Sequence, residues 1–110
     1  PSAGVEELVV GMVRGSFEYQ GQKCSAASRA YIPKSLWKEV EPRLIAMVKE
    51  LKVGDVEDFS NFMGAVIDKR SFDKNKSYID HAKQSSQAKI LVGGDCDESV
   101  GYFIQPNYFK

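Results

Sequence analysis

The chain has 110 residues, of which 43% are hydrophobic and 27% are charged, proportions that are ordinary for one soluble globular domain. Its 15 basic and 15 acidic residues balance, which gives no electrostatic case for nucleic acid or an anionic membrane as a partner. No apolar run approaches the roughly 20 residues that span a bilayer.

The first predicted element is an amphipathic helix over residues 4–20. Apolar side chains recur there at helical spacing, at Val5, Leu8, Val9, Met12, Val13 and Phe17. Gly21 suits the position just beyond a helix end, where a left-handed backbone favours glycine. Cys24 is therefore expected on a turn. Residues 28–33 alternate in polarity and predict a short strand that ends at Pro33.

A second helix follows, with Ser35 as its expected N-cap. Its apolar face is formed by Trp37, Val40, Leu44, Val48 and Leu51. Pro42 lies inside this run, so we expect a kink or a break near residues 38–41. Residues 52–61 carry turn residues without a clear period and predict a loop.

A third helix is predicted over residues 69–84, with Phe72, Ile79 and Ala82 facing inward. Residues 88–94 and 101–109 read as strands that pair as a hairpin through the loop 93–101. The order of elements is helix, strand, helix, helix, strand, strand. This order predicts the α/β class, a small sheet flanked by helices, within a single segment spanning residues 1–110.

The two cysteines are the most reactive side chains that this sequence offers for catalysis. Cys24 follows Lys23 and precedes Arg29 by five positions, and positive neighbours favour the reactive thiolate form. The pattern leaves two readings open, a reactive thiol and a structural one. Cys96 is the other cysteine, and we expect both to be free thiols. Cys24, Cys96 and His81 are isolated from one another in sequence, which argues against a metal site.

Other candidate residues favour structural readings. His81 has polar neighbours on its predicted helix and is expected at the surface rather than as a catalytic base. Gly21 lacks the Lys and Ser or Thr of a phosphate-binding loop, and the Gly93–Gly94 pair lacks the third glycine of a dinucleotide fingerprint. The acidic residues Asp95, Asp97 and Glu98 supply too few ligands for a calcium hand. Phe17, Trp37, Phe72 and Phe103 are expected in the core.

The stretch from Phe17 to Ala26, with Gly21, Gln22, Cys24 and Ser25 at fixed spacing, resembles the nucleophile signature of the aldehyde dehydrogenase superfamily. The resemblance continues in order through AYIPKSLW, KVGD, FMGAVIDKRSFDK and GYFIQPNYF, and it covers essentially the whole chain. Within the superfamily, EYQGQKCSAASRAYIP and GGDCDESVGYF resemble the 1-pyrroline-5-carboxylate dehydrogenases. These enzymes oxidise L-glutamate γ-semialdehyde to glutamate in proline catabolism.

This resemblance implies a chemistry for the turn. Cys24 would be the catalytic nucleophile, whose thiolate adds to the aldehyde. Collapse of the adduct passes hydride to NAD, and water hydrolyses the resulting thioester. Ser25 would bind the carboxylate end of the small-molecule substrate. Lys23 adjoins the site without an assigned role.

The resemblance also implies what lies outside this stretch. The cofactor-binding domain and the general-base Glu of the family have no counterpart here, so no residue of this chain is expected to bind NAD. We expect a processed or excised piece of the catalytic domain, since the chain begins with Pro1, and we expect it to be inactive alone. The full-length enzyme is expected to be a homo-oligomer, cytoplasmic or in the mitochondrial matrix. Another aldehyde dehydrogenase subfamily and a non-catalytic folded module remain alternatives.

Overall fold

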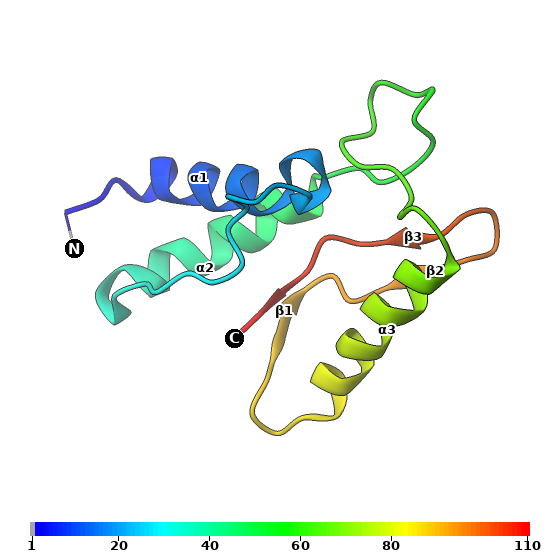
Figure 1. The fold of residues 1–110 in the computed structure, drawn as a ribbon. Coiled ribbons are helices and arrows are strands. Elements are labelled where there is room, and N and C mark those ends of the chain that lie inside the picture. The colour runs from blue at the N-terminus through cyan, green and yellow to red at the C-terminus, as the bar shows by residue number, and fades with distance from the viewer. Residues whose placement is uncertain (1) are drawn as a thin grey trace. The chain divides into compact units, whose positions relative to one another are not determined.

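The computed structural model describes residues 2–110, which form two compact units (Figure 1). Along the chain, the first unit ends at Glu50 and the second begins at Leu51. The elements of the first unit are α1 (Val5–Phe17), the 3₁₀ helix η1 (Glu18–Gly21) and α2 (Lys34–Lys49). Those of the second are α3 (Lys69–Gln84), β1 (Ile90–Val92), β2 (Cys96–Asp97), β3 (Phe103–Ile104) and β4 (Tyr108–Phe109). Helices with small antiparallel sheets confirm the predicted α/β class. Among the described residues, no helix combines the length and the apolar character needed to cross a membrane.

Helix α1 forms where the predicted apolar stripe lies. Val9 and Val13, one turn apart, are buried, and Glu6 and Glu7 place negative charge in the first turn, where the helix dipole favours it. The helix packs against α2, and Arg43 of α2 pairs with Glu6 at 3.2 Å. The predicted helix of residues 4–20 is thus confirmed as far as Phe17, but the following residues leave the right-handed helical conformation.

Helix α2 buries Val40, Leu44 and Val48 on one face. The expected N-cap at Ser35 is wrong, because the helix begins at Lys34 behind Pro33. The Pro33 carbonyl accepts the N–H groups of Leu36 and Trp37, at 3.0 and 3.1 Å. Of the expected kink or break, the break is wrong, since the helix continues through Pro42, where proline removes one main-chain N–H from the helix.

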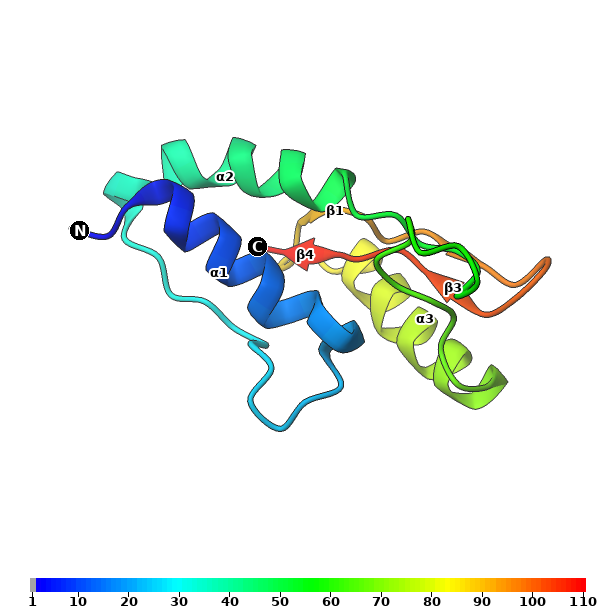
Figure 2. The same ribbon diagram turned by 90° about the horizontal axis from the view of Figure 1, so that it is seen from above.

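The strand predicted over residues 28–33 is absent from the first unit. This segment runs back along α1 to the start of α2 (Figure 2) and is assigned to no strand. A segment of alternating polarity forms a strand only if a second strand offers hydrogen-bond partners to its main chain. The described residues of the first unit contain no strand that could do so. Most of the segment is instead exposed.

The second unit is organised by α3. Asp68 caps the helix by accepting the Ser71 N–H at 2.7 Å, and Phe72 and Ile79 are buried as predicted. The Phe72 ring lies 5.7 Å from that of Tyr102, close to β3. Of the four aromatic residues expected in the core, only Phe72 is fully buried, whereas Phe17, Trp37 and Phe103 remain partly accessible.

The predicted hairpin is confirmed by antiparallel pairing of β1 with β4. Inside its connecting loop, β2 and β3 form a second two-stranded ladder, in which Cys96 faces Ile104. Gly93 and Gly94 turn the chain between β1 and β2 with φ of 74° and 92°. A side chain at Gly93 would collide with the Pro106 carbonyl, so glycine is required there.

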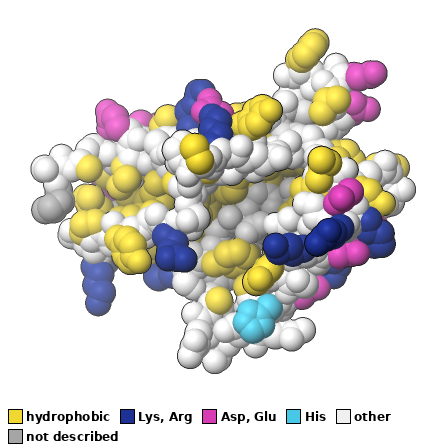
Figure 3. Space-filling view, viewed as in Figure 1, with side chains coloured by type: hydrophobic (Ala, Val, Ile, Leu, Met, Phe, Trp, Pro, Cys, Tyr) yellow, Lys and Arg dark blue, Asp and Glu magenta, His cyan; other side chains and the backbone are white. Residues whose placement is uncertain are grey.

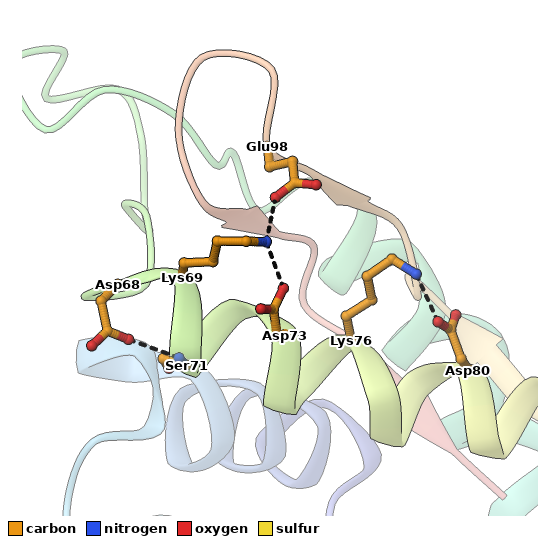
Figure 4. A network of polar contacts seen from close by, with 7 residues as sticks. All are labelled: Asp68, Lys69, Ser71, Asp73, Lys76, Asp80 and Glu98. Carbon is orange, nitrogen blue, oxygen red and sulfur yellow. Dashed lines mark hydrogen bonds and ion pairs between the residues drawn. The ribbon is translucent and has the colours of Figure 1, made fainter.

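Ion pairs connect α3 to itself and to the loop after β2 (Figure 4). The Lys69 ammonium donates to Asp73 at 2.9 Å and to Glu98 at 3.2 Å, and these carboxylates raise the pKa of Lys69. Lys76 pairs with Asp80 at 2.7 Å. The Lys69–Glu98 pair therefore occupies one carboxylate of the acidic loop at residues 95–98.

Candidate active site

Cys24 lies at the corner of a tight turn. The Ala26 N–H donates to the Lys23 carbonyl at 3.1 Å, which leaves Cys24 and Ser25 as the two central residues. Both side chains are exposed, as expected for a reactive thiol and not for a buried structural one. Immediately afterwards, the Ala27 N–H donates to the Gly15 carbonyl of α1 at 2.9 Å. The turn is thereby fixed to the helix that precedes it.

A left-handed stretch carries the chain from α1 into this turn. Tyr19, Gln20 and Gly21 have φ of 55°, 57° and 67°. Glycine adopts this conformation freely, which confirms the predicted left-handed backbone at Gly21, although α1 ends earlier, at Phe17. The two other residues each store about 1–3 kcal/mol of strain. A side chain at Gly21 would also approach the Ser16 carbonyl to 2.7 Å. Strain of this kind concentrates at functional sites, and here it precedes the candidate nucleophile.

Charge around the turn is organised by Glu18. Its carboxylate accepts from Lys23 at 2.9 Å and from Arg14 at 2.7 Å. These two hydrogen bonds, that from Lys23 first, lower the pKa of Glu18. The positive charge that the sequence places beside Cys24 is thus not isolated, because the Lys23 ammonium is paired with Glu18.

The two cysteines are both free thiols and have different surroundings. Cys96 lies on β2 and is half-buried, and burial is the main reason its pKa is raised. The nearby Lys76 and Lys83 oppose this effect, and Asp80 and Asp95 add to it weakly. Desolvation, rather than the acidic residues beside Cys96 in the sequence, is therefore the dominant cause.

The remaining candidates fall in the second unit. His81 is exposed on α3, which confirms its surface position, and the histidine is visible in cyan in Figure 3. A hollow of about 390 Å³ is lined by Val53, Gly54, Asp55, Asp97, Val100, Phe103 and Gln105. It contains neither a thiol nor an imidazole. No group of three acidic, His or Cys side chains within residues 2–110 is arranged to hold a metal ion.

The glycines of the chain do not form a site for a dinucleotide. A pyrophosphate is normally held at the start of a helix that follows a glycine-rich turn. The Gly93–Gly94 turn leads into β2, and the turn at Gly21 leads into the irregular segment 22–33. Neither turn therefore has the geometry that normally holds the pyrophosphate of a dinucleotide.

Sequence reasoning located Cys24 and its turn but missed Glu18. Lys23 and Glu18 are five positions apart, a spacing that does not bring side chains together on a helix. They meet only because the left-handed stretch reverses the chain. Arg14 and Glu18 are four positions apart, a spacing that brings side chains together on a helix, so this pair could have been predicted from the sequence.

Comparison with known proteins connects this geometry to a family. A sequence model of the aldehyde dehydrogenase family matches residues 1–110. The mitochondrial delta-1-pyrroline-5-carboxylate dehydrogenase of Dictyostelium discoideum is 58% identical over 105 residues, which are 96% of this chain and 19% of that protein. The corresponding Homo sapiens protein is 52% identical over 106 residues, again 96% and 19%.

Solved structures agree with these sequence relationships. The delta-pyrroline-5-carboxylate dehydrogenase of Mycobacterium tuberculosis matches with a TM-score of 0.93 and 45% identity, covering 98% of this chain and 20% of that one. The same protein has been solved bound with NAD. The chain thus spans about a fifth of the length of its relatives. Because the family model covers every residue, this chain belongs to the aldehyde dehydrogenase family.

Proposed function

We propose that this chain is the nucleophile-bearing segment of an NAD-dependent enzyme that oxidises L-glutamate γ-semialdehyde to glutamate in proline catabolism. The observation that carries the proposal is the exposed Cys24 at the corner of a hydrogen-bonded turn, in a chain that belongs to the aldehyde dehydrogenase family. The substrate assignment is supported by relatives named for 1-pyrroline-5-carboxylate, the cyclic form of the semialdehyde.

The chemistry assigned to Cys24 begins with its thiolate. A new S–C bond forms between the sulfur and the aldehyde carbon, and the carbonyl electron pair moves onto oxygen. When the oxyanion collapses, the carbon loses hydrogen with its electron pair and becomes a thioester. Water then attacks the thioester, the S–C bond breaks, and a carboxylate and the free thiol result. Main-chain N–H groups stabilise such oxyanions, and that of Cys24 is the donor this chain would contribute.

The second residue of the turn is assigned to substrate selection. Ser25 is exposed beside Cys24, so its hydroxyl is available as a hydrogen-bond donor. A donor next to the nucleophile suits the carboxylate of the semialdehyde, which distinguishes this substrate from simple aldehydes.

The cofactor is assigned to parts of a longer polypeptide. NAD supplies the hydride acceptor when bound, and a relative 45% identical to this chain has been solved with it. Because neither glycine turn opens a helix that could hold a pyrophosphate, we assign cofactor binding, and the general base, to sequence outside this segment. The isolated chain should then form no NADH above a Cys24→Ala control.

The setting of the full-length enzyme is also part of the proposal. We expect a homo-oligomer without nucleic-acid or membrane partners. The eukaryotic relatives are named as mitochondrial, which supports the mitochondrial matrix for a eukaryotic source and the cytoplasm otherwise.

The proposal is tested by exchanging one sulfur for oxygen in the full-length polypeptide that carries this segment. Cys24→Ser should reduce NADH formation from glutamate semialdehyde by about a thousandfold or more, as loss of a covalent nucleophile does. Cys96→Ser, the same change at the other thiol, should retain activity. Unchanged turnover in Cys24→Ser would reject Cys24 as nucleophile. Turnover of other aldehydes but not of the semialdehyde would indicate another subfamily.

A further inference from the structure

The Glu18 carboxylate is shared by two cations, one on each of its oxygen atoms. Arg14 reaches it from within α1, one helical turn earlier, at 2.7 Å. Lys23 reaches it from the nucleophile turn at 2.9 Å. The cluster therefore links the end of α1 to the residue that immediately precedes Cys24.

The backbone makes this contact possible. After Glu18 the chain passes through the left-handed residues Tyr19, Gln20 and Gly21, and the Gln22 N–H donates to the Tyr19 carbonyl at 3.1 Å. This reversal returns Lys23 to the helix end within five residues. Lys23 has a flexible four-carbon stem, so without a partner its ammonium can also approach the adjacent thiol.

We propose that Glu18 is a positioning residue that holds the Lys23 ammonium at the end of α1 and thereby keeps the electrostatic potential at Cys24 less positive than the sequence alone suggests. The inference deepens the proposed function, on which its catalytic meaning rests. The charged groups close to Cys24 along the chain are Lys23 and Arg29, and those that α1 and η1 contribute are Arg14 and Glu18.

The expected effect is modest because the pair is accessible to water. Lys23 and Glu18 each expose 43% of their side chains. Exposed ion pairs alter equilibria by about one-and-a-half- to fivefold. A neutral residue at position 18 should therefore release the Lys23 charge. The rate at which a charged reagent attacks Cys24, relative to a neutral reagent, should change by a factor in that range.

Two alkylating agents of different charge measure this potential without catalysis. Iodoacetate is an anion and iodoacetamide is neutral, and both react with the same thiolate. The ratio of their rates at Cys24 is therefore independent of how much thiolate is present and reports the local charge. It is measured on the full-length polypeptide by mass spectrometry of the peptide that contains Cys24.

Glu18→Gln should raise the ratio of iodoacetate to iodoacetamide rates by about one-and-a-half- to fivefold at low salt. The increase should disappear at about 1 M salt, where screening acts within about 3 Å. Glu6→Gln is the matched control, because it removes an ion-paired carboxylate from the same helix far from the turn, and it should leave the ratio unchanged. A general loss of structure would change both rates and not selectively favour the anion.

The double variant isolates the pair. Adding Glu18→Gln to Lys23→Gln should produce a clearly smaller increase than Glu18→Gln alone, because no ammonium is left to release and only the loss of the carboxylate charge remains. An unchanged ratio in Glu18→Gln, or an equal increase with and without Lys23, would overturn the proposal. If Glu18→Gln does not fold, Lys23→Gln alone decides, because a ratio lowered more than fivefold would show that Lys23 already acts on Cys24. None of these measurements needs turnover, so they remain decisive even if Cys24→Ser retains activity and the proposed function fails.

Discussion

The main-chain N–H of Ala27 donates to the carbonyl oxygen of Gly15 at 2.9 Å. This bond joins the residue three positions after Cys24 to the last turns of α1. Together with the left-handed stretch before the turn, it fixes the candidate nucleophile from both sides. The position of Cys24 thus depends on the integrity of α1 and of the reversal at Gly21.

The first prediction uses one substitution at two glycines. Gly21→Ala should lower the free energy of unfolding by about 1–3 kcal/mol, because a side chain is strained at φ 67° and meets the Ser16 carbonyl. Gly11→Ala should raise it by about 0.5–1 kcal/mol, because alanine favours a helix and no atom lies within 4 Å of the new methyl group. Native-state hydrogen exchange of the α1 amides measures both. Effects of the same sign would contradict the conformation described at Gly21.

The second prediction concerns acid sensitivity of α3. The Lys76 hydrogen bond lowers the pKa of Asp80 from its usual value of 3.8. A lowered carboxyl pKa gives stability that is present above the usual value and is lost as pH falls through the lowered one. The protection of α3 amides, meaning their exchange rates relative to the intrinsic rates at each pH, should therefore fall on acidification below about pH 4, and Asp80→Asn should remove part of this dependence. Asp95→Asn, at an exposed loop carboxylate, is the control, and equal flattening by both variants would contradict the assignment.

The third prediction compares the two thiols. Cys24 should react with iodoacetamide about tenfold faster than Cys96, because it is exposed while burial raises the pKa of Cys96. Short pulses of reagent followed by mass spectrometry of the two cysteine peptides give the rates. In a denaturant the rates should converge. Equal or reversed rates in the folded protein would indicate that Cys24 is not the accessible thiol.

Much of the fold follows from the sequence because its signals are local. The apolar period of α3 gives the same bounds, residues 69–84, as the structure. The strand at residues 28–33 was predicted wrongly because pairing depends on a second segment that polarity patterns do not reveal. The N-cap at Ser35 failed for a local reason, since the fixed backbone of Pro33 starts the helix earlier.

The candidate site also has features that the sequence predicted and features that it could not predict. Gly21 alone indicated that Cys24 lies on a turn, because glycine marks left-handed positions. The left-handed Tyr19 and Gln20 could not be anticipated, since such residues rarely adopt positive φ. The pairing of Glu18 with Lys23 depends on that reversal, and therefore it also could not be read from the sequence.

The fourth prediction tests the role of Ser25 in the full-length polypeptide. A hydrogen bond to a charged group contributes about 1.5–3 kcal/mol. Ser25→Ala should therefore lower kcat/KM for glutamate semialdehyde by about ten- to a hundredfold. A simple aliphatic aldehyde lacks the carboxylate and should lose little. Ser25→Leu should be worse for the semialdehyde, because its bulk fills space that the substrate's tail needs. Equal losses for both substrates would mean that Ser25 shapes the turn instead.

The covalent intermediate tests the central claim, that Cys24 is the nucleophile, most directly. Full-length polypeptide is mixed with NAD and glutamate semialdehyde, quenched in acid within one turnover, and digested for mass spectrometry. The account predicts an acyl group on the peptide that contains Cys24, absent without NAD and absent in Cys24→Ser. An acyl group on the peptide containing Cys96, or full turnover with no acyl group on Cys24, would contradict it.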